Sequence, residues 1–205
     1  MTDTGIVRGY GTGIIIKKTD KKHNKYPTMV KGLILTCFHV TPAQGTSKII
    51  VRFKKNGDSP AVLISADEAS DVALLESWVP EKCVPIKLAN KPPKAGDVVR
   101  MCGFGHIKDP KKPRYFEGTV WRSSTKNIVV LEDILPGDSG GSIVNEAGEL
   151  VGMMNSGRMD WLTTNDGVRY TSPLSGPAIE YFKLVIERHE IRRIASFFSE
   201  VHEDF

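Results

Sequence analysis

Short apolar runs separated by polar turns make up the first 175 residues of the chain. Within a run, apolar residues follow one another or alternate with polar ones, and the turns are rich in glycine, proline and asparagine. This pattern predicts β-strands rather than helices. The predicted strands are residues 13–16, 33–38, 48–53, 61–64, 72–75, 98–102, 119–121, 127–131, 142–145, 150–154 and 168–171. Many short strands joined by such turns are typical of a mainly all-β barrel or sandwich.

A polar segment with two adjacent prolines, residues 88–95, divides these strands into two groups. Polar and proline-rich stretches are where compact units are usually joined. We therefore expect an N-terminal β-barrel at 1–90 and a C-terminal β-barrel at 91–175. The two barrels would form one functional unit.

After residue 175 the pattern changes from strand to helix. Apolar residues recur every three or four positions from Ile179 to Val201, with no glycine or proline after Pro177. Ser175 suits a helix cap and Pro177 a first turn, so we expect a C-terminal helix at 176–205. We expect residues 177–205 to pack on the second barrel. Alternatively, the part from Ile191 offers an apolar stripe to a protein partner or a second copy.

Composition indicates an ordinary globular protein: 205 residues, 40% hydrophobic and 25% charged. No apolar run is long enough to span a membrane, and no signal-peptide pattern opens the chain. The odd set of three cysteines, without paired spacing, favours a reducing compartment over a disulfide scaffold. We therefore expect a cytoplasmic protein, although a domain cut from a larger precursor would look the same.

The formal net charge of +4 does not point to nucleic acid. Many of the N-terminal lysines flank residues 19–27, a polar segment that we expect to be a solvated loop between strands. No aromatic residues interleave with the basic ones and no nucleic-acid-binding motif is present. Neither nucleic acid nor a membrane is expected as a partner.

The segment Gly137-Asp138-Ser139-Gly140-Gly141 carries the clearest chemical signal. A serine between glycines in a tight turn supplies a nucleophile, and the neighbouring backbone N–H groups supply an oxyanion hole. We expect Gly137, Asp138 and Ser139 to form this hole. The N–H groups of Gly137 and Ser139 would be its donors.

A serine nucleophile needs a base and an orienting acid, and the chain offers both upstream. His39 follows the apolar run 33–38, whereas His23 and His106 lie in polar or glycine-rich loops. Asp71 directly precedes the apolar run 72–75, unlike its acidic neighbours at 67 and 68. We predict a triad of His39, Asp71 and Ser139, in the chain order of the chymotrypsin type.

The same glycine-rich segment also fits the Gly-x-Ser-x-Gly elbow of α/β-hydrolases. That fold needs alternating strands and helices, and a catalytic histidine after the serine. The downstream histidines, His189 and His202, lie on the predicted helix. This alternative is therefore disfavoured.

Six segments, taken in order, resemble the trypsin/chymotrypsin-like serine proteases, and among them the HtrA-type protease domain. They are residues 11–16, 36–40, 71–75, 95–99 with 103–105, 149–152, and 167–173. The resemblance implies a chymotrypsin-like double antiparallel β-barrel, a peptide or protein substrate, and no cofactor. Only about 30 residues follow the resembling part, so the peptide-binding module of HtrA proteases is not implied. Val40 stands where secreted relatives of trypsin have a disulfide-bonded cysteine.

The resemblance also suggests residues that bind substrate. In trypsin-like enzymes the residue six before the nucleophile lines the specificity pocket, and here it is Asp133. An acid there implies a preference for Lys or Arg before the scissile bond, unless the shorter HtrA loop turns it away. Asn155, Ser156 and Gly157 resemble the segment that pairs with the substrate backbone. Gly157 and Gly167 would line the pocket wall.

Three further expectations concern the partner of Asp138, metal binding and the choice between two functions. Asp138 needs a cationic partner, for which we expect an Arg or Lys from a nearby loop. Metal binding is not expected, because Cys37 with His39, and Cys102 with His106, lack a second close pair of ligands. The leading hypothesis is an intracellular serine endopeptidase. Its rival is a latent or inactive protease-fold module that recruits partners through the C-terminal helix.

Overall fold

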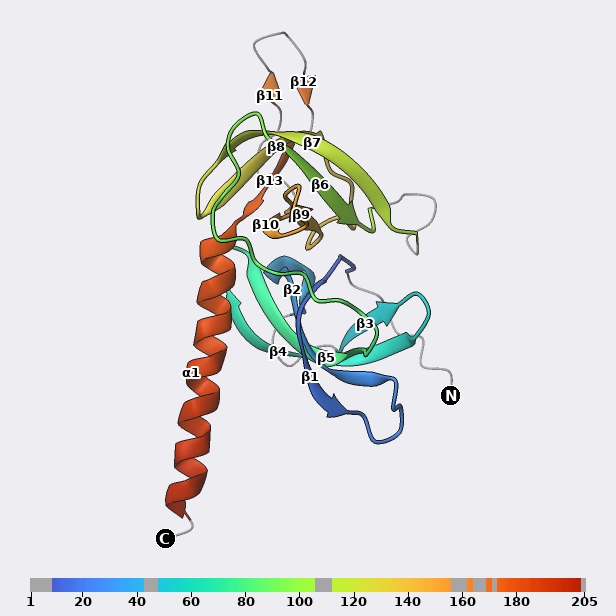
Figure 1. Cartoon of the computed structure of the whole chain (residues 1–205), viewed down its shortest axis with the longest axis vertical. Coiled ribbons are helices and arrows are strands. Elements are labelled where there is room, and N and C mark those ends of the chain that lie inside the picture. The colour runs from blue at the N-terminus through green and yellow to red at the C-terminus, as the bar shows by residue number, and fades with distance from the viewer. Residues whose placement is uncertain are drawn as a thin grey trace.

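Two antiparallel sheets, a small separate pair of strands and one long helix make up the described part of the molecule (Figure 1). The computed structural model describes residues 9–42, 48–105, 112–155, 162–163, 169–170 and 173–203. The first sheet has the strand order β1-β2-β5-β4-β3 and comprises β1 (Ile14–Lys22), β2 (Met29–Cys37), β3 (Ile49–Phe53), β4 (Gly57–Asp67) and β5 (Val72–Pro80). A single turn of 3-10 helix, η1 (Phe38–Val40), follows β2.

The second sheet follows the predicted linker in sequence. Its order is β10-β9-β6-β7-β8-β13, and it comprises β6 (Val98–Gly103), β7 (Arg114–Ser123), β8 (Asn127–Asp133), β9 (Ser142–Val144), β10 (Leu150–Met153) and β13 (Pro173–Pro177). Antiparallel bridges join Gly152 to Ala178 and Asn155 to Ser175, so the ends of this sheet meet and the barrel nearly closes. A small separate pair consists of β11 (Leu162–Thr163) and β12 (Arg169–Tyr170).

Pairing between β2 and β5 brings two distant parts of the chain together. The register runs without interruption from Met29 opposite Pro80 to Cys37 opposite Val72. Since antiparallel partners lie side by side, the end of β2 meets the start of β5. His39, just after β2, and Asp71, just before β5, are therefore neighbours.

One hydrophobic core joins the two sheets to the helix. Leu35 and Leu74 of the first sheet, Leu150 of β10 and Phe182 of the helix are fully buried in the same cluster. A second cluster fills the other barrel, with Ile128, Ile143 and Leu174 among its members. Because the shared cluster spans both sheets, their relative placement is fixed by apolar burial.

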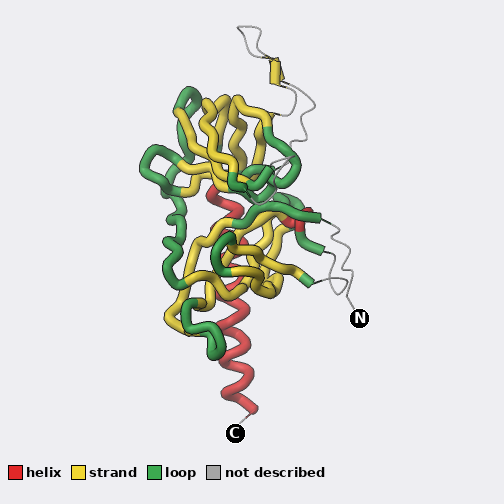
Figure 2. Tube along the Cα trace, turned by 90° about the vertical axis from the view of Figure 1, so that its right-hand side faces the viewer, coloured by secondary structure: helices red, strands yellow, loops and turns green. Residues whose placement is uncertain are grey.

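The C-terminal helix, α1 (Ile179–Glu203), begins against the second sheet and runs along the first (Figures 1 and 2). It packs on β4 and β5 as well as on β10. The expectation that it packs on the second barrel is therefore wrong for most of its length. The reason is apolar spacing: Ile179 enters the second core, but Phe182 and Val185 fall in the cluster shared with the first sheet.

The helix also begins later than predicted. Residues 173–177 form strand β13, in which Gly176 pairs with Ile128 and Ser175 with Val129 of β8. Ser175 and Pro177 are thus strand residues and not helix-capping ones. Pairing with β8 overrides the local helix signals, since it buries Leu174 completely. Strand β1 likewise continues to Lys22, into the segment expected to be a loop.

Candidate active site

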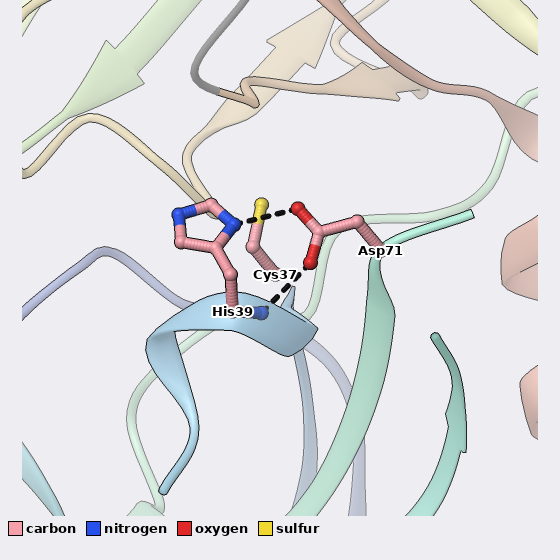
Figure 3. A group of neighbouring side chains, drawn as sticks. All are labelled: Cys37, His39 and Asp71. Carbon is pink, nitrogen blue, oxygen red and sulfur yellow. Dashed lines mark hydrogen bonds and ion pairs between the residues drawn. The ribbon is translucent and has the colours of Figure 1, made fainter. Parts of the chain in front are cut away.

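His39 and Asp71 form a hydrogen-bonded pair between η1 and the start of β5 (Figure 3). The His39 Nδ1 lies 2.6 Å from the Asp71 Oδ2, and the His39 backbone N–H donates to Oδ1 at 2.7 Å. Each carboxylate oxygen thus has one partner on His39. This arrangement fixes the ring, whose other nitrogen points away from Asp71 (Figure 3).

Asp71 has a backbone conformation that non-glycine residues rarely adopt, with φ at +58°. Such strain persists only where neighbouring contacts hold it. The Phe38 N–H donates to the Asp71 carbonyl at 3.1 Å, and the Asp71 N–H donates to the Glu68 carbonyl at 3.1 Å. Both contacts keep the carboxylate directed at His39.

Asp67, four residues before Asp71, bonds to Ser70 and Arg188. Its Oδ2 accepts from the Ser70 hydroxyl at 2.6 Å, and its Oδ1 pairs with Arg188 of α1 at 3.0 Å. The Ser70 bond, with help from Arg188, lowers the pKa of Asp67 against the effect of burial. Asp67 therefore shapes the turn that carries Asp71 and does not face His39 itself.

Cys37 lies beside this pair at the end of β2 (Figure 3). Its sulfur, the imidazole and the Asp71 carboxylate offer three ligand atoms within 4.8 Å of one another. Burial, and then the charge of Asp71, raise the pKa of the Cys37 thiol well above its usual range. The Cys37 thiol donates to the Met154 carbonyl at 3.3 Å, and the imidazole of His39 is bonded to the Asp71 carboxylate at 2.6 Å. We therefore interpret Cys37 as part of the packing.

The turn that contains Ser139 has two backbone N–H groups without an acceptor among the described residues. The Asp138 N–H donates to the Leu135 carbonyl at 3.0 Å, that of Gly140 to Met154 at 2.7 Å, and that of Gly141 to Asp138 at 2.7 Å. Within the described part of the chain, the N–H groups of Gly137 and Ser139 donate to no carbonyl. These are the two donors that the sequence predicts for an oxyanion hole.

Glycines are required at two positions of this turn. Gly137 has φ at +98° and Gly140 at +86°, in the left-handed region. A Cβ on Gly140 would fall against the Thr12 carbonyl and the Thr36 hydroxyl, and one on Gly137 would lie 2.6 Å from the Tyr10 ring. The turn is therefore packed closely against the chain that precedes β1.

Asp138 is fully buried and has three partners. Arg114 Nη1 lies 2.6 Å from its Oδ2, while the N–H groups of Gly105 and Leu135 donate to the two oxygens at 2.7 and 3.0 Å. Arg114 also donates to the Asp133 carbonyl at 3.0 Å, and its guanidinium carbon lies 3.7 Å from the centroid of the Phe116 ring. The expected cation is thus an arginine, but it begins strand β7 instead of lying in a loop.

The Met154 carbonyl bonds both to the His39 region and to the Ser139 turn. The Met154 carbonyl accepts from the Cys37 thiol at 3.3 Å and from the Gly140 N–H at 2.7 Å. Cys37 precedes His39 by two residues and Gly140 follows Ser139. Ser139 is 7% exposed, and no hydrogen bond joins its side chain to His39 in the described part of the chain.

The predicted substrate-binding residues are only partly within the described structure. Asp133 ends β8 and is half-buried. Asn155 follows β10, and its N–H donates to the Ser175 carbonyl at 3.1 Å. Ser156, Gly157 and Gly167 lie outside the described residues, as does His106.

Sequence reasoning missed the part played by Thr12. Its hydroxyl donates to the Gly137 carbonyl at 2.8 Å, and its N–H donates to the Ser139 carbonyl at 2.7 Å. A hydroxyl between Gly11 and Gly13, before an apolar strand, was the available signal. The sequence does not show that this hydroxyl bonds to the turn at Gly137, 125 residues further along the chain. Only the fold brings the two together.

Comparison with known proteins agrees with this geometry. A family model described as a trypsin-like peptidase domain matches residues 11–153. A probable periplasmic serine protease do/HhoA-like of Haemophilus influenzae is 27% identical over 194 residues, covering 91% of this chain and 38% of that protein. The periplasmic pH-dependent serine endoprotease DegQ of Escherichia coli is 28% identical over 153 residues, covering 71% of this chain and 30% of that protein.

Solved structures are similar in fold. The serine endoprotease from Yersinia pestis matches with a TM-score of 0.62 at 25% identity, covering 89% of this chain and 58% of that one. An inactive form of Rv3671c from Mycobacterium tuberculosis matches with a TM-score of 0.62 at 16% identity, covering 88% and 82%, and supports the fold alone. The chain spans about a third of the length of the curated relatives. It belongs to the trypsin-like peptidase family, as a serine protease domain of the HtrA type.

Proposed function

We propose that this chain is a serine endopeptidase in which His39, Asp71 and Ser139 form the catalytic triad. One observation carries the proposal: among the described residues, the N–H groups of Gly137 and Ser139 have no acceptor, whereas the N–H groups of Asp138, Gly140 and Gly141 are bonded. A purely structural turn gains nothing from two unpaired donors, since unpaired polar groups reduce stability. An oxyanion hole requires them.

The proposed reaction proceeds in two halves. The Ser139 hydroxyl attacks the carbonyl carbon of the scissile peptide bond while the free ring nitrogen of His39 accepts its proton. The new oxyanion accepts hydrogen bonds from Gly137 and Ser139. His39 then protonates the leaving amine, which departs and leaves an acyl-enzyme on Ser139. Water then attacks the ester while His39 accepts its proton, and collapse of the second tetrahedral intermediate returns that proton from His39 to the Ser139 oxygen and releases the acid.

Asp71 supports these steps without exchanging a proton. Its carboxylate accepts from Nδ1, which leaves the other ring nitrogen as the base. It also stabilises the imidazolium that forms when His39 holds the serine proton. The second bond, from the His39 backbone N–H, keeps donor and acceptor aligned.

Hydrolysis of casein and of a fluorogenic peptide tests the proposal. We expect Ser139→Ala to abolish turnover, and Asp71→Asn to lower it about 10⁴-fold, the loss recorded for the matching acid of the chymotrypsin triad. Circular dichroism of each variant controls for folding. A folded Ser139→Ala protein that hydrolyses casein as fast as the wild type would contradict the triad.

We also propose a preference for Lys or Arg before the scissile bond, through Asp133. Its place at the end of β8, shortly before the Ser139 turn, supports this. Asn155, Ser156 and Gly157 would pair with the substrate backbone, and Gly157 and Gly167 would line the pocket. A peptide library varied at that position should favour Lys and Arg in the wild type, and Asp133→Asn should reduce the preference at least tenfold. Equal cleavage after Leu and Lys would exclude it.

We propose an intracellular setting from the three cysteines, all of which are unpaired thiols. The two curated relatives are named as periplasmic proteins. Within the described residues, α1 is too polar to cross a membrane, and no other helix is long enough. Peptides and proteins are the proposed substrates.

A further inference from the structure

We propose that Thr12 is a positioning residue that holds the oxyanion hole in its working geometry. This role rests on the proposed serine endopeptidase function. Thr12 lies before β1 and is 7% exposed. It belongs to the chain that precedes the first sheet, whereas the turn that it contacts lies between β8 and β9 of the second.

The Thr12 hydroxyl is fully used. It donates to the Gly137 carbonyl at 2.8 Å and accepts from the Phe104 N–H at 3.0 Å. The first contact is buried and the second is partly buried. A hydrogen bond shielded from water has a greater effect on geometry, and its loss costs more, than an exposed one. The hydroxyl therefore ties the Gly137 carbonyl to the end of β6.

The Thr12 backbone is tied to the same turn. Its N–H donates to the Ser139 carbonyl at 2.7 Å, and its own carbonyl accepts from the Thr36 hydroxyl at 2.7 Å. Thr36 is on β2, three residues before His39. The contacts of Thr12 thus connect the turn that carries the nucleophile to the strand that leads to the base.

These hydrogen bonds hold the carbonyl groups of the turn and leave the N–H groups of Gly137 and Ser139 without an acceptor among the described residues. Thr12 holds the carbonyls of Gly137 and Ser139, while Gly141 holds that of Asp138. The peptide unit between Pro136 and Gly137 is the middle unit of the turn closed by the Asp138 N–H and the Leu135 carbonyl. Gly137 has the positive φ of the third residue in a type II turn.

The middle peptide unit of a turn is the one that rotates between type II and type I, and its N–H is that of Gly137. Rotation would turn this donor away from the substrate oxygen. Thr12 anchors the carbonyls of Gly137 and Ser139, on both sides of Asp138, and thereby opposes this rotation, which requires the backbone of Gly137 to change its conformation. Loss of the hydroxyl frees the Gly137 carbonyl and leaves the Phe104 N–H without its acceptor.

The test compares Thr12→Val, which keeps the shape, with Thr12→Ser, which keeps the hydroxyl. We measure kcat and KM for a fluorogenic peptide, and inhibition by a peptide boronic acid whose tetrahedral adduct places an oxygen in the hole. Ser77→Ala is the matched control. The Ser77 hydroxyl is buried and bonds to the Pro60 carbonyl at 2.9 Å and to Ser59 at 3.1 Å, but lies in the first sheet away from the site.

For Thr12→Val we expect kcat to fall about 10- to 100-fold, less than the full loss of one oxyanion donor, with KM within about threefold. Boronic acid affinity should fall in parallel with kcat/KM, and Thr12→Ser should recover most of both. Ser77→Ala should melt earlier but keep its kcat. If the wild type is active and Thr12→Val is equally active, the positioning role of Thr12 is wrong. The same holds if Thr12→Ser is as impaired as Thr12→Val. Either result leaves the serine endopeptidase function standing. An inactive wild type would overturn the serine endopeptidase function and this role together.

Discussion

The carboxylate of Asp138, next to the predicted nucleophile Ser139, is buried and depends on its hydrogen-bonded partners. Its side chain is 0% exposed and that of Arg114 is 21% exposed. Removing one member of such a pair leaves a charge without compensation away from water, which is strongly destabilising. Arg52 and Asp58 form a pair of similar geometry, with 2.7 Å between Nε and Oδ1, but both side chains are exposed. When one of them is removed, water can solvate the charge of the other.

We therefore predict different outcomes for two matched substitutions. Asp138→Asn should lower kcat/KM at least tenfold and reduce the melting temperature, because Arg114 loses its nearer and fully buried counter-charge and keeps only Glu132, at 3.7 Å. Asp58→Asn should change neither quantity noticeably. Peptide hydrolysis and thermal unfolding measure both. Full activity of Asp138→Asn would show that the buried pair has no part in shaping the site.

Single residues were predictable from sequence where the signal was local. The apolar runs next to His39 and Asp71 predicted both side chains, and the structure brings the two together. The role of Ser139 stays a prediction. Arg114 and Thr12 were not assigned, because each reaches the turn only through long-range strand pairing. Nothing in the local sequence around an Arg at the start of a strand, or a Thr before a strand, predicts a contact with a distant turn.

Among the elements, α1 links the end of the chain to the acid of the predicted triad. Arg188 pairs with Asp67 at 3.0 Å and donates to the Ala66 carbonyl at 3.3 Å. Asp67 in turn holds Ser70, the residue before Asp71. The helix therefore stabilises the turn in which Asp71 adopts its strained conformation.

This contact predicts a pH dependence of stability. The folded pKa of Asp67 lies below its ordinary value of 3.8, so its contribution is present above that pH and is lost as the pH falls through the folded pKa. Asp67→Asn should melt earlier than the wild type at pH 6, and the difference should shrink below about pH 3.8. Thermal unfolding from pH 7 to pH 3 measures it. A constant difference across that range would contradict the assigned role.

The strands show what periodicity can and cannot predict. The apolar runs located some central strands almost to the residue, such as β6, but the structure extends β4, β5 and β7 well beyond their apolar runs. Extended edges depend on pairing with a neighbouring strand, which a local pattern does not contain. The strand β13 was missed for the same reason, since Ser175, Gly176 and Pro177 favour a turn or helix start in isolation.

At the scale of the whole molecule, the site lies where the two sheets meet. The Met154 carbonyl contacts both the Cys37 thiol and the Gly140 N–H, and Thr12 reaches the Ser139 turn from the start of the first sheet. Sheet placement is maintained by the shared apolar cluster rather than by disulfides, since Cys37, Cys83 and Cys102 are all free.

We predict from this that reducing agents leave the protein unaffected. Melting temperature and peptide hydrolysis should be the same with and without dithiothreitol, because no covalent bond between cysteines supports the fold. Iodoacetamide should modify native Cys37 least, because burial raises its pKa and closes access to it. Loss of activity in dithiothreitol, or rapid modification of Cys37, would be inconsistent with this packing.

Labelling by a fluorophosphonate, read by intact mass, tests the central claim most directly, since the reagent reacts with a serine only when base and oxyanion donors are in place. The account predicts one adduct on the wild type and none on Ser139→Ala or His39→Ala. A folded wild-type protein that gains no adduct would contradict an assembled catalytic site. Equal labelling of the wild type and Ser139→Ala would place the reactive serine elsewhere.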